Sequence, residues 1–266
     1  SGGISKCVSG DTLIFSDKGI IPIKEFYKNE KPDEFRNIDL NLASIDGLRK
    51  ANYFYYGGYK PTIILHLEDG RKIEGTYNHR LKVANKYGYD WKRLDEITTE
   101  DYVAVKIGSN VWAKERVKID PTLFNKIYGC QKTIKIPEEI TPEFGRFLGY
   151  YIAEGTIMRK TWSLLITNND LHVLRRCKKI VKELFNLEGK ILIDKRNGVK
   201  TFKVNSKTLI ELLLYLGCKE KSAEKEIPWA ILRSPEDVVR EFISGLWLDG
   251  YIALNKKGSW KVAICL

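Results

Sequence analysis

The sequence pattern changes once along the chain, and this change most constrains the fold. Residues 8–110 hold short apolar, β-branched runs separated by turn signals such as Asp17-Lys18-Gly19 and Asp69-Gly70. Beyond Pro137 the pattern becomes helix–strand–strand–helix. A chain of 266 residues is long enough for two domains. We therefore expect a β-rich domain over 7–110, a connector over 111–137 and an α+β domain over 138–266.

Local signals define the expected elements within these parts. In the first part we expect strands at 12–15, 20–23, 52–56, 62–67, 72–74, 80–84 and 102–106. In the second part we expect helices at 144–153, 171–185, 208–216 and 237–248, and strands at 156–158, 163–167, 190–194, 200–204, 251–254 and 260–266. The helix starts carry capping residues, two of them followed by proline: Thr141-Pro142, Asn169 or Asp170, Ser206, and Ser234-Pro235.

Composition argues against several classes of protein. No run approaches the ~20 apolar residues of a membrane span, and there is no secretory leader, so we expect a cytoplasmic protein without a membrane partner. Five cysteines without a Cys-x-x-Cys pair argue against a disulfide scaffold and against a structural zinc site. Abundant Lys and Glu with a single glutamine, Gln131, favour a thermophilic source.

The positive charge is concentrated in the second part of the chain. Residues 1–110 carry 17 basic and 16 acidic side chains, whereas residues 111–266 carry 28 basic and 18 acidic ones. This asymmetry indicates that the second part binds nucleic acid. A solvated basic surface without a ligand is the alternative.

A candidate nucleophile lies near the start of the chain. Cys7 precedes a turn signal, Ser9-Gly10-Asp11, and an apolar run. A free thiol has a pKa of about 8.5, so a cysteine nucleophile needs a partner at neutral pH. Thr76 and His79, three residues apart on an expected turn, are the best partners because both can point at one target. An inert, buried cysteine with an unrelated turn histidine is the alternative.

These two segments together resemble a known family. Cys-x-x-Gly-Asp-Thr-x-Ile from Cys7, followed by Gly-Thr-x-x-His ending at His79, resembles the N-terminal splicing blocks of inteins and of the wider hedgehog/intein (Hint) family. The resemblance implies a β-rich Hint horseshoe over 7–110 and an N-extein tail over 1–6. It also implies that Cys7 attacks the carbonyl of the scissile Lys6–Cys7 bond. Thr76 and His79 would polarise this bond and protonate its nitrogen, without a cofactor.

Two expected helices of the second part end in the same way. The segments 142–155 and 238–250 are apolar, contain internal glycines, and end in an acid followed by glycine, at Glu154 and Asp249. The glycines Gly145, Gly149 and Gly245 would allow the two helices to pack closely. An acid at a helix C-terminus is unfavourable against the macrodipole, and a divalent metal would compensate it. A purely structural helix interface is the alternative.

This helix pair resembles the LAGLIDADG homing endonucleases that lie inside many inteins, and Lys225-Glu226-Ile227-Pro228 resembles a further block between their two motifs. The resemblance implies that Glu154 and Asp249 bind Mg²⁺ for phosphodiester hydrolysis, and that four-stranded sheets hold double-stranded DNA. The basic residues expected to contact DNA, each with a solvated surface position as its alternative, are Arg159, Lys160, Lys195, Arg196, Lys200 and Lys203.

The second motif departs from the first. Five steps separate Gly149 from Glu154, but four separate Gly245 from Asp249. One residue turns a helix by about 100°, so Asp249 is expected to be misdirected and DNA cleavage to be weak or absent. Few residues follow Gly250, so we also expect a truncated endonuclease domain over 138–266 with an incomplete second repeat.

The leading functional hypothesis is the N-terminal portion of an intein, with a natural split within the endonuclease domain favoured over a shortened form of a continuous intein. It would carry out autocatalytic protein splicing by an N–S acyl shift at Lys6–Cys7 and carry an endonuclease-type DNA-binding domain. Its expected partners are a C-terminal intein fragment with the terminal Asn and the C-extein, flanking exteins and DNA. The alternatives are a site-specific LAGLIDADG endonuclease with the Hint part as scaffold, and a Hint autoprocessing domain without splicing.

Overall fold

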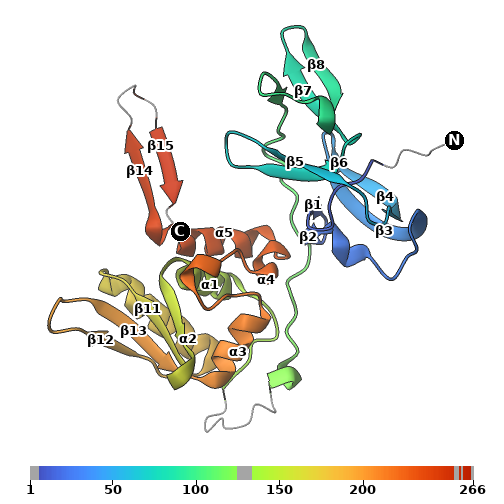
Figure 1. Ribbon diagram of the computed structural model, residues 1–266. Helices are drawn as coiled ribbons and strands as arrows, with labels where there is room; N and C mark the ends of the chain where they lie inside the picture. The colour runs from blue at the N-terminus through green and yellow to red at the C-terminus, as the bar shows by residue number, and fades with distance from the viewer. Residues whose placement is uncertain (1–5, 125–133, 255–257, 259, 265–266) are drawn as a thin grey trace. The chain divides into compact units, whose positions relative to one another are not determined.

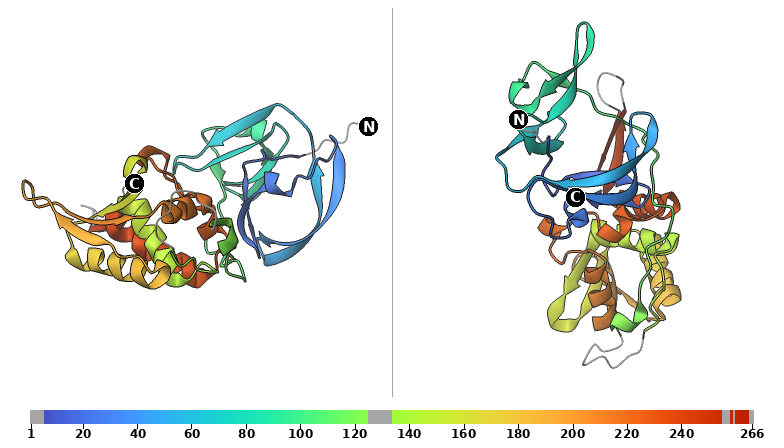
Figure 2. Two further views of the ribbon diagram at one scale, coloured as in Figure 1. Left: turned by 90° about the horizontal axis from the view of Figure 1, so that it is seen from below. Right: turned by 90° about the vertical axis from the view of Figure 1, so that its right-hand side faces the viewer.

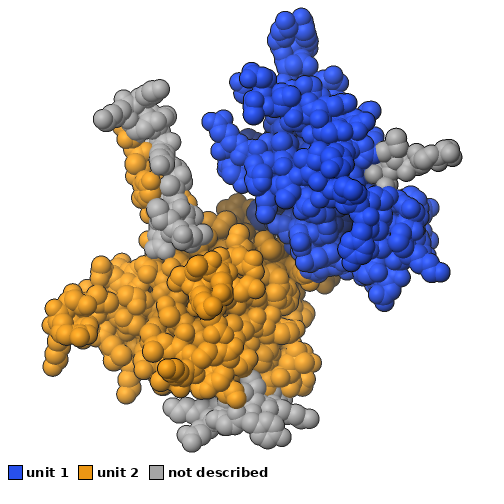
Figure 3. Space-filling view, viewed as in Figure 1, with its two compact units in different colours: residues 1–112 blue, residues 113–266 orange. Residues whose placement is uncertain are grey.

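The computed structural model describes residues 6–124, 134–254, 258 and 260–264, without the side chains of Asp249 and 260–264. The chain forms two compact units, Ser1–Trp112 and Ala113–Leu266 (Figure 3). Of the expected tail over 1–6, only Lys6 is therefore described, and residues 125–133 of the expected connector lie outside the described part. The rest of that connector does not stand apart, because Ile119, Phe124 and Ile134 pack into the core of the second unit.

The first unit is built from short antiparallel strands. Its strands are β1 (Leu13–Ser16), β2 (Gly19–Pro22), β3 (Glu34–Ser44), β4 (Gly47–Tyr56), β5 (Thr62–His66), β6 (Lys72–Thr76), β7 (Arg80–Asn85), β8 (Gly88–Arg93) and β9 (Tyr102–Val103). They form sheets in the orders β2-β1-β3-β4, β5-β6 and β8-β7-β9. The long β3–β4 hairpin is strongly curved (Figure 2).

Glycines with positive φ make the tight turns of this unit possible. Gly47 (φ +108°) joins β3 to β4, and Gly70 (φ +85°) lies in the turn between β5 and β6, as the Asp-Gly signals predict. Leu67 accepts the Gly70 amide at 3.0 Å and donates its own amide to the Arg71 carbonyl at 2.8 Å. This hairpin fixes the position of Thr76, the last residue of β6.

Most strands predicted in the first unit are confirmed, but β3 and β8 were missed. The β3 sequence mixes apolar residues with Asp39 and two asparagines, which are poor strand formers. Pairing with β4 along its whole length, through a bulge between Asn37 and Leu40, overrides that local preference. The horseshoe arrangement implied by the resemblance stays a prediction.

The second unit has a four-stranded sheet covered by helices and a separate two-stranded hairpin. Its elements are α1 (Pro142–Glu154), β10 (Gly155–Met158), β11 (Ser163–Thr167), α2 (Leu171–Phe185), β12 (Lys190–Ile193), β13 (Lys200–Asn205), α3 (Lys207–Tyr215), α4 (Trp229–Leu232), α5 (Glu236–Leu246), β14 (Gly250–Leu254) and β15 (Trp260–Ile264). The main sheet has the antiparallel order β10-β11-β13-β12, and β14–β15 is a separate hairpin (Figure 1).

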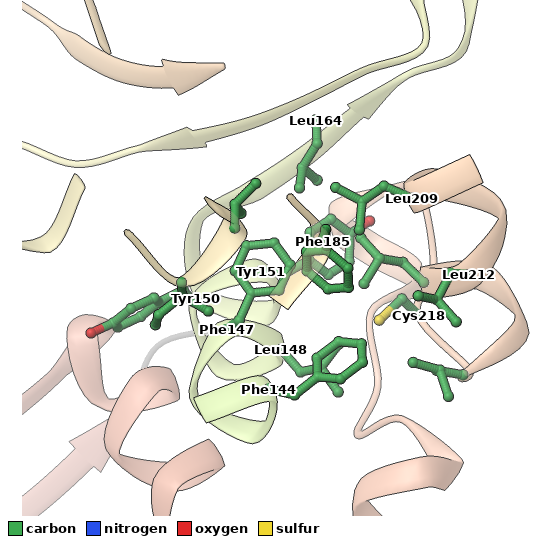
Figure 4. Close-up of a cluster of buried hydrophobic side chains, with 14 of the residues drawn as sticks. Phe144, Phe147, Leu148, Tyr150, Tyr151, Leu164, Phe185, Leu209, Leu212 and Cys218 are labelled. Carbon is green, nitrogen blue, oxygen red and sulfur yellow. The ribbon is translucent and has the colours of Figure 1, made fainter. Parts of the chain in front are cut away.

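Alternating residues of the main sheet give it one apolar and one polar face. Leu164, Ile166, Phe202 and Val204 are almost completely buried under the helices. The aromatic side chains of α1 meet Phe185 of α2 there, and the ring centroids of Phe144 and Phe185 lie 5.2 Å apart, edge to face. Figure 4 shows this cluster, which also includes Leu209, Leu212 and Cys218.

Capping bonds explain why most helices start where the sequence predicts. Thr141 accepts the Phe144 amide at 3.3 Å, Asp170 accepts the His172 amide at 2.7 Å, and Ser206 accepts the Leu209 amide at 3.2 Å. The prediction for Ser234 was wrong. Its hydroxyl donates to the Ala230 carbonyl at 2.6 Å, so α5 begins after Pro235 without a side-chain cap.

The helices α1 and α5 cross at their glycines, as predicted. A Cβ atom on Gly145 would lie 2.6 Å from the Val238 carbonyl oxygen, and one on Gly149 would lie 2.9 Å from the Gly245 Cα. Both distances are far inside van der Waals contact, so the backbones themselves touch. The crossing therefore requires the absence of side chains at these positions.

We expect Gly149→Ala to destabilise the protein by roughly 1–3 kcal/mol through overpacking. The sign is diagnostic, because alanine is otherwise better than glycine inside a helix by about 1 kcal/mol. Chemical denaturation measures the change. Ser244→Ala, at an exposed position of α5, is the matched control and is expected to shift stability by no more than about 0.5 kcal/mol. Equal stabilities of the two variants would contradict the crossing geometry.

Candidate functional site

Residues 7–9 are held against the end of β6. Val8 forms an antiparallel bridge with Gly75, the Thr76 amide donates to the Cys7 carbonyl at 2.9 Å, and the Ser9 amide donates to the Glu74 carbonyl at 3.0 Å. A Cβ atom on Gly75 would lie 2.9 Å from the Cys7 carbonyl oxygen, so only glycine permits this approach. The pairing fixes Cys7 beside Thr76, although 69 residues separate them in sequence.

Thr76 contacts the peptide nitrogen of Cys7. Its buried hydroxyl oxygen accepts the Cys7 amide hydrogen at 3.1 Å. The hydroxyl hydrogen lies toward Asn78 Oδ1, at 2.8 Å, with the Cys7 carbonyl oxygen more distant at 3.4 Å. Thr76 therefore holds the nitrogen of the Lys6–Cys7 bond, the bond that the sequence predicts to be cleaved.

His79 reaches the other residue of that bond. The turn after β6 is closed by the His79 amide, which donates to the Thr76 carbonyl at 2.8 Å. Burial, followed by the positive charge of Lys6, holds the pKa of the imidazole below its usual value, while a hydrogen bond with the Lys6 backbone acts in the opposite direction. Its Nδ1 atom is buried and has no hydrogen-bond partner among the described residues. The structure thus brings Cys7, Thr76 and His79 together at one peptide bond.

The Cys7 thiol lies in a notch that the sequence analysis missed. A Cβ atom on Gly57 would lie 2.8 Å from the sulfur, so the thiol occupies space that any larger residue would fill. The same point lies 3.4 Å from the Tyr55 ring and 3.6 Å from Lys60 Cε. The Gly57-Gly58 pair after β4 was the available signal, since adjacent glycines mark a close approach of backbone.

The other described cysteines are unsuited to nucleophilic chemistry. Cys177 and Cys218 are buried in the second unit, whereas Cys7 is partly exposed. Burial raises the pKa of the Cys177 thiol to about 12 and that of Cys218 further still. Among the described thiols, Cys7 is therefore the one that a reactant can reach.

The expected metal ligands are described only in part. Glu154 ends α1, is half-buried, and accepts from Asn168 Nδ2 at 3.4 Å. Asp249 lies in a short 3₁₀ turn, Trp247–Asp249, and its side chain is outside the described part. Within that part, no group of three or more His, Cys, Asp or Glu side chains is placed to hold a metal ion.

A lysine compensates the helix dipole at the end of α1, a role that we expected of a metal. Lys225 Nζ donates to the carbonyls of Tyr151, Ile152 and Gly155 at 3.0, 3.0 and 2.8 Å. A cation at these carbonyls neutralises the negative end of the helix dipole. The helix end therefore does not by itself require a divalent ion, and a metal at Glu154 and Asp249 stays a prediction.

Several residues expected to contact DNA are paired within the protein. Arg159 forms ion pairs with Glu211 and Glu220 at 2.8 and 2.7 Å. Arg196 pairs with Asp194 at 2.9 Å, and Lys200 Nζ donates to the Asn169 carbonyl at 2.8 Å. The remaining candidates are Lys160 and Lys195, which are exposed, and Lys203, which is half-exposed.

The outer face of the main sheet contains a further lysine that sequence reasoning missed. Lys203 of β13 lies directly opposite Lys190 of β12 in the strand register. Directly opposed like charges destabilise a sheet unless something neutralises them. No carboxylate pairs with either lysine in the described part of the chain. The signal was the strand alternation, which places both on the face opposite Phe202.

The chain matches segments of much longer proteins. It is 32% identical over 96% of its length to an A-type ATP synthase subunit of Pyrococcus abyssi. It is 32% identical over 94% of its length to a DNA polymerase of Thermococcus litoralis, and 24% identical over 91% to replication factor C small subunit of Methanocaldococcus jannaschii. The chain spans 26%, 16% and 12% of these three proteins. No protein-family model matches it.

These matches correct the family assignment made from the motifs. The motifs led us to identify the chain as the N-terminal portion of an intein with an embedded LAGLIDADG homing endonuclease. The matching proteins are instead named for the A-type ATP synthase and for DNA polymerase, and no family model supports the assignment. The reason is that a few short motifs specify local geometry, and such geometry does not establish a family.

The location of the protein was inferred from its lack of apolar runs. None of the described residues forms a helix that is long and apolar enough to cross a membrane.

We expect the stability of the protein to fall as the pH drops below about 6.5, in part because of His79. Its folded pKa is lowered, so the unfolded chain binds a proton at a higher pH than the folded one does. The contribution of His79 to stability is therefore complete above the pKa of the unfolded state, and it is lost as the pH falls through the pKa of the folded state. In His79→Gln, the stability lost between pH 7.5 and 5.0 should be smaller than in the unaltered protein. The difference should stay below about 1 kcal/mol, because the ring is partly exposed.

Denaturant unfolding of both proteins at the two pH values measures this difference. His66→Gln, which removes an exposed imidazole from β5, is the matched control. If His79→Gln and the unaltered protein lose stability equally on acidification, the imidazole environment described above is wrong.

Proposed function

We propose that the chain carries out the first step of autocatalytic protein splicing, an N–S acyl shift at Lys6–Cys7. One observation carries the proposal: Thr76 contacts the nitrogen of this bond while His79 contacts the Lys6 backbone. A thiol, a hydroxyl and an imidazole that converge on one peptide bond suit acyl transfer. A cysteine serving only to pack the core would not need these two groups around its own amide.

The step rearranges one peptide bond. The Cys7 thiol loses its proton to water, and the sulfur attacks the Lys6 carbonyl carbon. The C–S bond forms, the C–N bond breaks, and the Cys7 nitrogen takes up a proton, which leaves a thioester and a free amine. A protonated imidazole whose pKa is lowered is a stronger acid, which suits His79 to donate to this nitrogen.

The distribution of related segments also supports the proposal. Nearly the whole chain aligns within proteins named for ATP synthesis, DNA replication and DNA polymerisation. It occupies only a minor share of each of them. A segment shared by proteins of such different names acts independently of their activities. A unit that processes its own junction with the surrounding chain has this property.

The proposal is tested on the full chain treated with a small thiol, which intercepts a thioester. We expect slow cleavage between Lys6 and Cys7, seen in the intact mass spectrum as loss of residues 1–6. Cys7→Ala should abolish this cleavage, because the amide then has no internal nucleophile. His79→Gln should slow it by about a hundred- to ten-thousand-fold, the usual range for a general acid.

Ser9→Ala, next to the site but without a contact to the scissile bond, is the control and should cleave normally. Two results would reject the proposal. One is a chain that remains intact in thiol at all times, and the other is cleavage that persists in Cys7→Ala.

A second candidate function is binding of double-stranded DNA by the outer face of the main sheet. It is favoured by the opposed pair Lys190 and Lys203, whose mutual repulsion a row of phosphates would relieve. Hydroxyls of Thr167 and Thr201 lie 3.2 Å apart on the same face and can donate to phosphates or bases. Hydrolysis of bound DNA would need Mg²⁺ at Glu154 and Asp249, and the binding proposal does not depend on it.

We expect Lys190→Ala and Lys203→Ala each to weaken binding to a mixed-sequence duplex and to lower the slope of log K against log salt by about 0.9. Because the substitution also relieves repulsion, the free protein should become slightly more stable. Salt titrations and denaturation measure both effects. Lys179→Ala removes the same charge from the exposed surface of α2 and serves as control. An equal loss of affinity in the control would mean that only net charge matters.

A further inference from the structure

We infer that Lys60 is a positioning residue for Cys7: its ammonium group, held by Asp33, stabilises the thiolate that attacks Lys6. This inference rests on the proposed acyl shift and names a residue that the shift would use. It is carried by the arrangement of side chains around the sulfur and by the way in which Lys60 is held there.

The Cys7 sulfur, the Tyr55 ring and the Lys60 stem all lie close to Gly57. The notch at Gly57 is bounded by the Tyr55 ring and by the Lys60 stem, at 3.4 and 3.6 Å from a single point that is itself 2.8 Å from Cys7 Sγ. Because Gly57 has no side chain, nothing from this residue separates the sulfur from Lys60. The lysine stem is therefore a neighbour of the nucleophile.

Lys60 is held in place by a carboxylate. Its Nζ lies 3.1 Å from Asp33 Oδ1, and the same oxygen accepts from the Tyr55 hydroxyl. The Lys60 side chain is only 32% exposed, whereas exposed lysines of the same unit reach 60% or more. A cation whose position is fixed and whose stem is covered acts on its neighbours more strongly than a mobile surface lysine does.

The backbone beside Lys60 has two left-handed residues, Asp33 and Gly58, of which Asp33 is strained. Asp33 adopts φ +64°, which is unfavourable for a residue with a side chain, and its amide donates to the Tyr56 carbonyl at 2.8 Å. Gly58 has φ +71°, and a Cβ atom there would lie 3.0 Å from Pro32. Strained backbone of this kind persists where the surrounding structure requires it, often at functional sites.

The charges around the thiol divide into two groups. Tyr55 at the end of β4 and Lys60 in the loop that follows lie beside it, with Asp33, just before β3, bound to both, while Lys6 and His79 lie at the scissile bond. Hydrogen bonding to Asp33 is the main cause that raises the pKa of Lys60, and the charge of Cys7 adds a smaller effect in the same direction.

Lys60 keeps its proton throughout this step. The thiol proton goes to water and the ammonium group only stabilises the anion that remains. The role therefore differs from that of His79, which acts at the nitrogen. It predicts that removal of Lys60 changes the pH at which Cys7 becomes reactive.

The experiment is the pH dependence of Cys7 alkylation by iodoacetamide in the full chain, followed by mass spectrometry of the peptide that contains Cys7. In Lys60→Met, the midpoint should move to higher pH, and the alkylation rate at pH 7 should fall on the order of three- to tenfold. Lys60→Arg should retain most of the rate. Lys50→Met, which removes a lysine paired with Asp39 in the same hairpin, should leave the profile unchanged.

Identical alkylation profiles for folded Lys60→Met and the unaltered protein would overturn the inference, as would an equal shift in Lys50→Met. Circular dichroism shows whether each variant is folded, and Lys60→Gln provides a second test if Lys60→Met is not, since it also removes the ammonium group and should shift the profile in the same direction. Alkylation requires no cleavage. A shifted profile without thiol-induced cleavage would therefore count against the proposed function alone.

Discussion

The pairing of residues 7–9 with the end of β6 is the interaction on which the candidate site depends. The bridge between Val8 and Gly75 places the Cys7 amide on the Thr76 hydroxyl and the Lys6 backbone within reach of His79. It is possible because Gly75 has no side chain where the Cys7 carbonyl lies. Without this pairing, the three groups would belong to distant and unrelated parts of the chain.

The second unit depends on a comparable close approach. Contact between the backbones of α1 and α5 at Gly145, Gly149 and Gly245 brings the C-terminal ends of two helices together. One of these ends is stabilised by Lys225, which binds three carbonyl oxygens of the helix terminus. In both units, glycine allows two backbone segments to approach where side chains would otherwise keep them apart.

Local signals explain what could be predicted from the sequence. Thr141 and Pro142 mark the start of α1, and Gly70 marks a hairpin, because these preferences are set by a few neighbouring residues. Proximity of Cys7, Thr76 and His79 was also predicted, from two short motifs. Gly57, Lys60 and Asp33 were missed because they meet the thiol only through the long β3–β4 pairing, which local preference opposes.

Other errors have equally specific causes. Ser234 is of a residue type that often caps helices, but its hydroxyl donates a hydrogen bond to the Ala230 carbonyl of the preceding turn instead. The cation at the end of α1 was missed because this lysine lies 70 residues further along the chain. The family was misassigned because short motifs describe a site, whereas relatedness is a property of the whole alignment.

The hydrogen bond from Thr76 to Asn78 affects which role Thr76 can have at the Lys6–Cys7 bond. With its hydrogen directed at Asn78, the Thr76 oxygen presents a lone pair to the Cys7 nitrogen. It can therefore orient that nitrogen, both as an amide and as a released amine. Orientation by Thr76 and protonation by His79 are then separate roles, carried by two side chains of one turn.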